Sequence, residues 1–231
     1  MKNILAIFLM LLLVSCGSNN HYIPNPVDQM IKSMKNEKAY TIILDDMDVR
    51  SDDFYHKYSV LKESKSGEFS NSETEWLLVD YNYFKANEGN LGMQIVTKDS
   101  TGKVSKVVAP AGYANYVGNS RYGHWQGSGS DRFWVFYGQY AFMRSMFGLG
   151  YYPCYYPMYN NYYSHYYRTN RAFYGSGFRG SGNYYGTSSA NAKKRNPNFF
   201  ERKARNNNWS SSRRTASSRR SGRGSGFGYG K

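Results

Sequence analysis

Five aspartates lie close together near residue 50, and carboxylates are the ligands that calcium prefers in proteins. They are Asp45, Asp46, Asp48, Asp52 and Asp53. A calcium-binding EF-hand loop needs an Asp or Asn at positions 1, 3 and 5 and a Glu at position 12. Counted from Asp46, position 5 is Arg50 and position 12 is Lys57, so the spacing does not fit. We therefore expect a solvated turn between two strands here.

A glycine motif and the histidines give no catalytic or metal-binding set. Gly175, Gly177 and Gly180 match the G-x-G-x-x-G fingerprint of dinucleotide-binding proteins, which requires a strand before it and a helix after it. The motif lies in a tract of Gly, Tyr and Ser, so chance explains it. The histidines, at positions 21, 56, 124 and 165, are too far apart to indicate a zinc site. His56 lacks a nucleophile beside it, so we expect a residue on a strand face, no enzyme activity, no metal and no cofactor.

The basic residues of the last third are the strongest candidates for binding. Residues 151–231 contain fifteen Lys or Arg and one acid, whereas residues 1–150 contain fifteen of each kind. Flexible segments that combine cations with aromatic rings bind polyanions through phosphate pairing and stacking. Phe199, Phe200 and Trp209 lie among these cations. The candidate polyanion-binding residues are Lys193, Lys194, Arg195, Arg202, Lys203, Arg205, Arg213, Arg214, Arg219, Arg220 and Arg223.

Which polyanion is available depends on the compartment, and the first residues of the chain indicate it. Lys2 precedes eleven consecutive apolar residues, 4–14. A membrane-spanning helix needs about 20 such residues, so this run has the length of a signal-peptide core instead. Leu13-Val14-Ser15-Cys16 resembles the lipobox of bacterial lipoproteins. An ordinary secretion signal that happens to contain a cysteine is the alternative.

The lipobox resemblance implies a lipid anchor in the cell envelope. In that family the cysteine receives a diacylglyceryl group, the signal is cut before it, and the new amine is acylated. The resemblance thus makes residues 1–15 a signal peptide and residues 16–24 a tether with lipidated Cys16 at its end. The aspartate that retains enteric-type lipoproteins in the inner membrane does not follow Cys16, which implies the outer membrane, facing the periplasm. The polyanions of that location are lipopolysaccharide and peptidoglycan, and arginine pairs especially well with phosphates.

Two further observations concern the remaining cysteine and the end of the chain. With Cys16 lipidated, only Cys154 is left, so no internal disulfide can form. We expect Cys154 to be buried among aromatic residues, with pairing between two chains as the alternative. Gly226-Phe227-Gly228 is similar to the ends of basic Gly/Ser/Arg-rich tails in little-characterised bacterial lipoproteins, a resemblance that implies no function.

Residues 25–112 have the pattern of a small α+β domain. Asn25 can cap a helix that begins at Pro26, and apolar residues recur at helical spacing as far as Met34. Segments rich in β-branched and aromatic residues then predict five strands, at 39–44, 54–61, 75–80, 91–97 and 103–109. The turn residues at 99–102 predict a hairpin between the last two. We expect one N-terminal helix packed on a mostly antiparallel five-stranded sheet.

The remaining segments differ strongly from this domain in composition. Residues 113–150 read as a connector rich in glycine and aromatic residues, with an apolar helix near 133–148 that packs on the domain or lies in the membrane interface. Residues 151–231 contain no Leu, Ile or Val, and twelve tyrosines lie between 151 and 185. This composition predicts a disordered Tyr/Gly/Ser/Arg-rich basic tail with a brief helix at 199–205.

Together these features predict a lipid-anchored envelope protein of structural or adhesive type. Its cationic, aromatic tail would engage anionic envelope material or a partner protein. The alternative is a ligand-binding or enzymatic module in residues 22–150, with the tail as a spacer. A third possibility is nucleic-acid binding by the tail.

Overall fold

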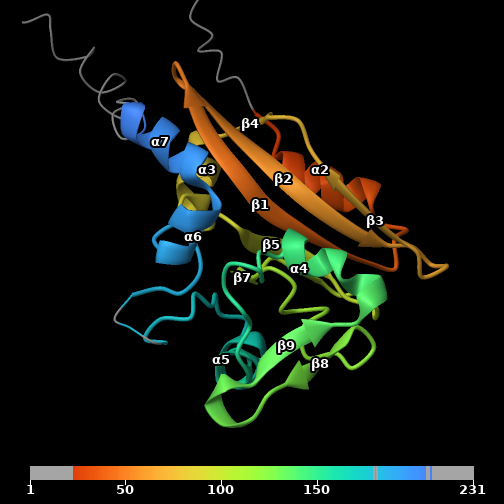
Figure 1. Cartoon of the computed structure of the whole chain (residues 1–231). Helices are drawn as coiled ribbons and strands as arrows, with labels where there is room; N and C mark the ends of the chain where they lie inside the picture. The colour runs from red at the N-terminus through yellow and green to blue at the C-terminus, as the bar shows by residue number, and fades with distance from the viewer. Residues whose placement is uncertain (1–22, 179, 181, 207–208, 210–231) are drawn as a thin grey trace, which may run out of the picture.

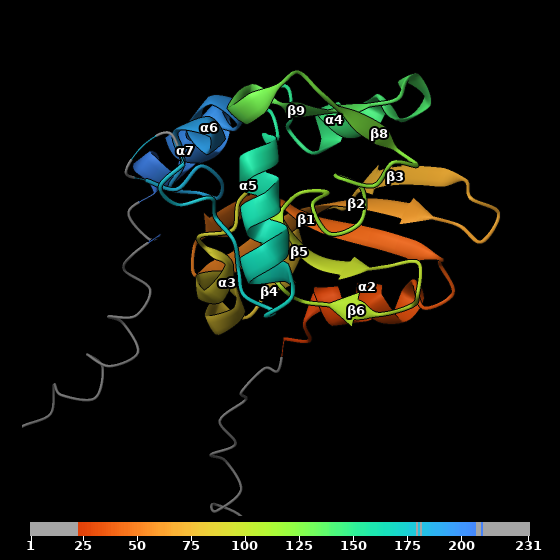
Figure 2. The ribbon, with the colours of Figure 1, turned by 90° about the horizontal axis from the view of Figure 1, so that it is seen from below.

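The computed structural model describes residues 23–178, 180, 182–206 and 209. An antiparallel sheet lies at its centre, with helices α2 and α3 on one face and the segments of residues 111–185 on the other (Figures 1 and 2). The predicted α+β class is therefore confirmed. The signal peptide, Cys16 and the end of the basic tail lie outside the described residues.

The sheet follows the strand order β3-β2-β1-β5-β6, and each pairing along it is antiparallel. Two short strands extend it, β4 against β2 and β7 against β5. Each predicted strand region contains a strand, but residues 103–109 divide into two short ones. β3 was not expected, because its mostly exposed FSNSE sequence has no apolar alternation. The bounds are β1 Ala39–Arg50, β2 Asp53–Glu63, β3 Phe69–Glu73, β4 Leu77–Val79, β5 Met93–Lys98, β6 Val104–Ser105 and β7 Ala109–Pro110.

Two helices cover one face of the sheet. The Asn25 side chain accepts a hydrogen bond from the backbone N–H of Val27 at 2.9 Å, so the first helix is capped as the sequence predicts. Asp80 caps the second helix in the same way. Val27 and Phe84 are buried in one cluster with Ile42 of the sheet. The helices are α2, Pro26–Ser33, and α3, Tyr81–Asn87.

The predicted hairpin between β5 and β6 is present, and Asp99 closes it. Asp99 Oδ1 accepts hydrogen bonds from the backbone N–H groups of Thr101, at 2.9 Å, and Lys103, at 3.0 Å. A short carboxylate that bonds to the backbone two residues onward mimics a turn. The turn chemistry read from the sequence is therefore the chemistry that the structure uses.

β1 contains a β-bulge at Asp45. Leu44 and Asp46 lie opposite neighbouring residues of β2, so Asp45 is an extra residue without a partner. The bulge shifts the alternation of the strand, because Leu44 and Met47 pack in the same core cluster although they are three residues apart. The expected solvated turn is therefore wrong for Asp45, Asp46 and Asp48, which lie within β1, and for Asp53, which begins β2; Asp52 does lie in the turn. The turn begins only at Ser51.

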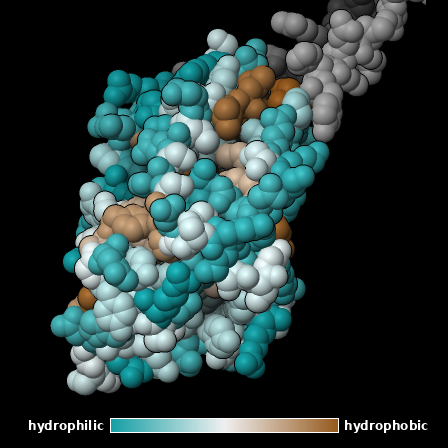
Figure 3. All heavy atoms as spheres, turned by 90° about the vertical axis from the view of Figure 1, so that its right-hand side faces the viewer, coloured by the Kyte–Doolittle hydropathy of each residue, from teal (hydrophilic) through white to brown (hydrophobic). Residues whose placement is uncertain are grey.

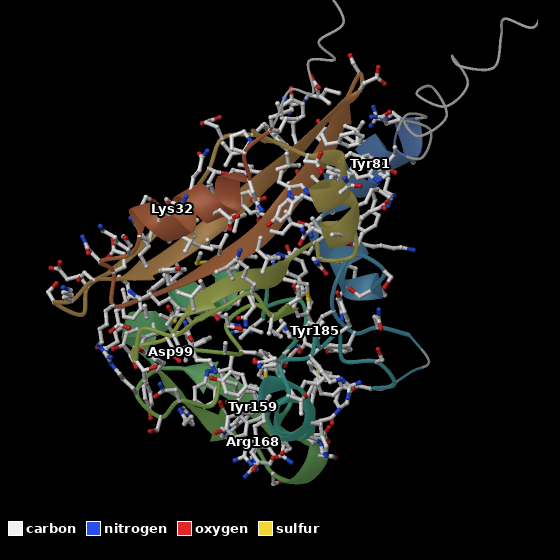
Figure 4. All side chains as sticks on the ribbon, turned by 180° about the vertical axis from the view of Figure 1, so that it is seen from behind. Lys32, Tyr81, Asp99, Tyr159, Arg168 and Tyr185 are labelled. Carbon is white, nitrogen blue, oxygen red and sulfur yellow. The ribbon has the colours of Figure 1, made fainter. Side chains whose placement is uncertain are left out.

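An aromatic layer built from residues 111–185 covers the other face of the sheet. Ile43 and Leu61 of the sheet pack against its buried rings, and Figure 4 shows Tyr159 and Tyr185 within this layer. Rings that meet at their edges, such as Tyr113 and Tyr185 with centroids 5.7 Å apart, are frequent in it. Its elements are β8 Gly123–Gln126, η2 Gly129–Asp131, β9 Phe133–Phe136, η3 Gly138–Tyr140, α4 Phe142–Met146, α5 Tyr156–Asn161 and the π-helical η4 Tyr162–Tyr167.

The predicted helix at 133–148 is wrong in its first half. Residues 133–136 form β9, in which Trp134 and Phe136 are buried and the other two residues are half-buried. Apolar residues on both faces of this strand concealed its period of two. Only α4 is helical, and its Met143 is buried in the aromatic layer, so the segment packs on protein.

The connector predicted at 113–150 also contains strand β8, which its glycine-rich composition did not predict. Gly123 lies within β8, and a Cβ at this position would lie 2.1 Å from the carbonyl oxygen of Val135 on β9. Glycine is needed here because the two strands approach closely.

Ordered structure continues well beyond residue 150, where the composition predicts disorder. Helices α6, Ala190–Arg195, and α7, Pro197–Arg205, follow the aromatic layer, and Phe173 and Phe199 are buried. The prediction counted only aliphatic core formers, whereas each Tyr or Phe can bury roughly 150–250 Å². The brief helix expected at 199–205 is confirmed within α7. Residues 210–231 lie outside the described part.

One face of the molecule is mainly hydrophilic. Figure 3 shows one face, seen from the right of Figure 1, on which brown apolar patches are few and separate. Within the described residues, no helix is long and apolar enough to cross a membrane.

Candidate binding groove

A polar groove lies between the sheet and the two helices α4 and α6. It has a volume of about 640 Å³ and is open to solvent. The largest concave site with converging polar groups is the usual place to look for a ligand. Its lining residues are Asp45, Ser59, Asn71, Ser72, Glu73, Phe142, Ser145, Met146, Tyr151, Arg195 and Asn196.

Asp45 supplies a negative charge on the sheet side of the groove. The bulge in β1 places its side chain there, and burial raises the pKa of its carboxyl group. Among the described residues, no side chain forms a hydrogen bond or an ion pair with it, although Arg195 lies close enough to lower its pKa partly. A half-buried carboxylate without a direct partner, in a groove, is typical of a functional position.

Arg195, the last residue of α6, supplies a positive charge on the opposite side. Its guanidinium group donates hydrogen bonds to Tyr152 Oη, at 3.1 Å, and to the Met146 carbonyl oxygen, at 3.0 Å. These two bonds fix its direction. Within the described part of the chain it forms no ion pair, so its charge is held in place but not neutralised by contact.

Glu73 is the second carboxylate of the groove, and it is already paired. Its Oε2 lies 2.6 Å from Nζ of Lys57, and its side chain is 61% exposed. The hydrogen bond to Glu73 raises the pKa of the Lys57 ammonium group. Glu73 therefore contributes much less free charge to the groove than Asp45 does.

The rest of the lining combines small polar groups with exposed rings. Ser59, Asn71 and Ser72 offer hydroxyl and amide groups for hydrogen bonding. Phe142 and Tyr151 are 38% and 58% exposed, which is unusual for large apolar side chains. Rings beside hydrogen-bonding groups suit a ligand with both hydroxyl groups and apolar C–H faces, such as a sugar or a peptide.

The predicted basic residues of α7 are engaged within the chain. Arg202 donates to both carboxylate oxygens of Asp46 at 2.6 Å. Lys203 lies 3.1 Å from Glu88, and Arg205 lies 2.9 Å from Glu201. The first two ion pairs attach α7 to β1 and to Glu88 at the end of α3, which accounts for part of the charge asymmetry of the sequence, whereas the third lies within α7 itself.

The other predicted site residues are scattered. Lys193 and Lys194 are exposed on α6, whereas Arg195 turns into the groove. Cys16 and five of the predicted cations lie outside the described residues. Those five are Arg213, Arg214, Arg219, Arg220 and Arg223.

His56 and Cys154 are both fully buried. Burial lowers the pKa of His56 to about 3, and its Nδ1 lies 2.9 Å from the Tyr58 hydroxyl oxygen. It is therefore neutral at physiological pH and inaccessible to a substrate. Cys154 lies in the aromatic layer, as expected, and burial raises the pKa of its thiol. In the described residues, no group of His, Cys, Asp and Glu could hold a metal ion.

A second cluster of charges surrounds Glu63, which is fully buried. Its carboxylate forms ion pairs with Lys38 Nζ, at 2.8 Å, and with Arg121 Nη1, at 3.0 Å. It also accepts a hydrogen bond from the Tyr122 hydroxyl group at 3.1 Å. These partners satisfy the carboxylate, so we interpret this cluster as structural.

Comparisons with protein-family models, with curated proteins and with solved structures find no match for this chain. The groove must therefore be interpreted from its own chemistry. Sequence reasoning missed it, because its residues come from strands and helices far apart in the chain. One signal was present in the sequence: the alternation of apolar residues along β1 is interrupted at Asp45, which indicates a bulge.

Proposed function

We propose that this protein is a lipid-anchored binding protein of the bacterial cell envelope that holds cell-wall polymer in the groove. The lipobox-like run ending at Cys16 supports the anchor. The buried thiol of Cys154 fits an exported chain that needs no disulfide. We place the protein at the outer membrane, facing the periplasm, where peptidoglycan is the polymer within reach.

The observation that carries this proposal is the composition of the groove. Exposed rings, amide and hydroxyl groups, and charges of both signs line a single open depression. A peptidoglycan strand presents the matching features: sugar rings with C–H faces, many hydroxyl and amide groups, and peptides with amines and carboxylates. Strands of this kind are long, and an open groove admits a segment of polymer where an enclosed pocket would not.

The tether length fits a link between membrane and wall. Ile23, the first described residue, lies seven positions beyond Cys16 in the sequence. An extended chain spans at most about 3.6 Å per residue, or about 25 Å in total. The domain is therefore kept near the lipid surface, and binding of wall polymer would join the two layers.

The groove supports binding better than hydrolysis. Enzymes that cleave glycosidic bonds use a pair of carboxyl groups in different protonation states. Here Glu73 is held by Lys57, so Asp45 is the only lining carboxylate without a direct partner among the described residues. We therefore propose a structural, non-enzymatic role.

Co-sedimentation with purified peptidoglycan sacculi tests the proposal. The lipidated protein in detergent micelles should sediment with sacculi, and Tyr151→Ala should weaken binding roughly threefold to tenfold, as expected for a lost ring contact of ~0.5–1.5 kcal/mol. Tyr137→Ala is the matched control, because Tyr137 is 42% exposed and lies outside the groove. Wild-type protein that stays in the supernatant, or equal losses in both variants, would refute the proposed function.

Polyanion binding by cations at the end of the chain is a second candidate. Lys193 and Lys194 are exposed on α6 and form no ion pair with other described residues. Phosphate-rich partners such as lipopolysaccharide, or nucleic acid, would bind here through contacts that weaken steeply with salt. Replacing Lys193 and Lys194 with Gln separates this candidate from the groove, because the double substitution removes these cations and leaves the lining of the groove unchanged.

A further inference from the structure

We infer that the groove recognises a zwitterion, with a ligand ammonium group at Asp45 and a ligand carboxylate at Arg195. This inference rests on the proposed function and specifies it: the protein would bind the peptide part of the wall polymer, where amines and carboxylates occur together. The glycan part would contribute the contacts with the exposed rings.

The first support is the arrangement of the two charges. Asp45 and Arg195 line the same groove and influence each other electrostatically. They do not form an ion pair, so no nitrogen–oxygen distance between them is 4.0 Å or less. Opposite charges that face each other across a gap can be bridged by a ligand that carries the complementary charges.

The second support is that the two charges belong to separate elements of the fold and that one of them is held in place. Asp45 is part of β1, whose pairing with β2 sets the position of its backbone. The Arg195 side chain is held by Tyr152 and by the carbonyl oxygen of Met146. The guanidinium group is therefore positioned in the free protein, and a ligand does not need to order it when it binds.

The third support comes from the ligands that the groove disfavours. A polyanion would be repelled by Asp45, and a polycation would be repelled by Arg195. A neutral glycan would leave both charges without partners while it removed water from them, which is costly. Only a ligand with both signs of charge satisfies both sides.

The test uses soluble wall fragments with intact peptides and the lipidated full-length protein in detergent micelles. Calorimetry is carried out with three forms of the fragment: unmodified, acetylated at the free amine, and amidated at the free carboxylates. Each modification should weaken binding to the wild type roughly tenfold or more, since a charge-assisted contact is lost.

Two groove variants assign each loss to a residue. Acetylating the amine should no longer weaken binding to Asp45→Asn, and amidating the carboxylates should no longer weaken binding to Arg195→Gln. The controls are Asp53→Asn and Lys32→Gln, which change exposed residues outside the groove; Lys32 lies on α2, on the other face of the sheet (Figure 4). Both controls should respond to the modifications as the wild type does. Arg195→Lys keeps the charge and should retain part of the sensitivity to amidation even if Arg195→Gln fails to fold.

The possible failures are distinguishable. If modified and unmodified fragments bind the wild type equally well, or peptide-free glycan binds as tightly, the zwitterion inference is wrong while wall binding stands. If neither the fragments nor intact sacculi bind to the protein, the proposed function is wrong as well. If the groove variants stay as sensitive to the modifications as the controls, zwitterion recognition lies elsewhere and the assignment to Asp45 and Arg195 is overturned.

Discussion

Asp45 shows how one inserted residue changes the chemistry of a strand. Without the bulge, a run of alternating residues would place each side chain of β1 on a defined face of the sheet. The extra residue directs a carboxylate into the groove while Leu44 and Met47 keep their places in the core. The aspartate cluster was visible in the sequence, but we interpreted it as a turn. Arg195, which lines the same groove, lies 150 residues away, and no local pattern reveals that the two are neighbours.

Replacing Asp45 with Asn should stabilise the fold at pH 7. Burial raises the pKa of Asp45, Glu73 and Asp46 raise it further, and Arg195 and Lys57 oppose the shift only in part. A carboxyl group whose pKa is higher in the folded state binds more protons when folded, so its charge lowers stability at pH values above that pKa. The advantage of Asp45→Asn should therefore shrink as the pH falls toward 3.8, the ordinary value of the group.

Urea unfolding followed by tryptophan fluorescence at pH 7 and pH 4 measures this effect. Asp53→Asn, at an exposed position of β2, should change stability by less than about 0.5 kcal/mol at both pH values. If Asp45→Asn is more stable but no longer binds wall fragments, Asp45 serves binding at a cost in stability. A loss of stability for Asp45→Asn at pH 7 would contradict the electrostatic account of the groove.

Among the elements, the first helix, most strands of residues 39–110 and the brief helix within α7 were predictable, whereas β3, β8, β9 and the aromatic layer were not. Asn25 and Asp99 act through local chemistry, which the sequence displays directly. β9 and α7 depend on distant contacts: Trp134 is buried only because the sheet and the aromatic layer enclose it, and α7 is held by ion pairs to β1 and α3. Tyrosine-rich composition was interpreted as disorder, yet here the rings themselves form the core.

The packing of α7 gives a prediction for Phe199. Phe199 is 1% exposed and contacts Trp209, with ring centroids 5.4 Å apart. Phe199→Ala should lower the free energy of unfolding by roughly 3–5 kcal/mol, the usual cost of emptying a buried aromatic site. Trypsin should then cut within 193–205 much faster than in the wild type.

Phe200→Ala is the matched control, because Phe200 is the neighbouring ring and only partly buried. Its effect should be less than half as large. Equal effects of the two substitutions, or wild-type protein that trypsin cleaves rapidly between 193 and 205, would show that α7 is not packed as described.

At the scale of the whole chain, two features can be recognised in the sequence. They are the apolar start with its lipobox-like run and the uneven distribution of charge. The charge asymmetry was interpreted as a sign of an external polyanion. In the structure, Arg202 and Lys203 pair with Asp46 and Glu88, so part of the excess serves contacts within the fold. Composition shows how much charge a segment carries, but the partner of each charge depends on tertiary structure.

The anchor gives a prediction for Cys16. Cys16→Ala should abolish labelling with radioactive fatty acid and leave the protein uncleaved or soluble, because the thiol that takes the lipid is absent. Cys154→Ala is the matched control and should be labelled normally, since Cys154 is buried in the aromatic layer. Persistent labelling of Cys16→Ala would remove the basis for placing this protein at a membrane.

Wall binding in the groove is tested most directly by amide hydrogen exchange of the lipidated protein with and without soluble wall fragments. We predict slower exchange in the segments that line the groove, 71–73, 142–151 and 195–196, and at Asp45 on β1. Exchange around Tyr163 and Arg168, which are exposed and lie outside the groove, should not change. Protection confined to that region, or no protection at saturating fragment, would contradict the account.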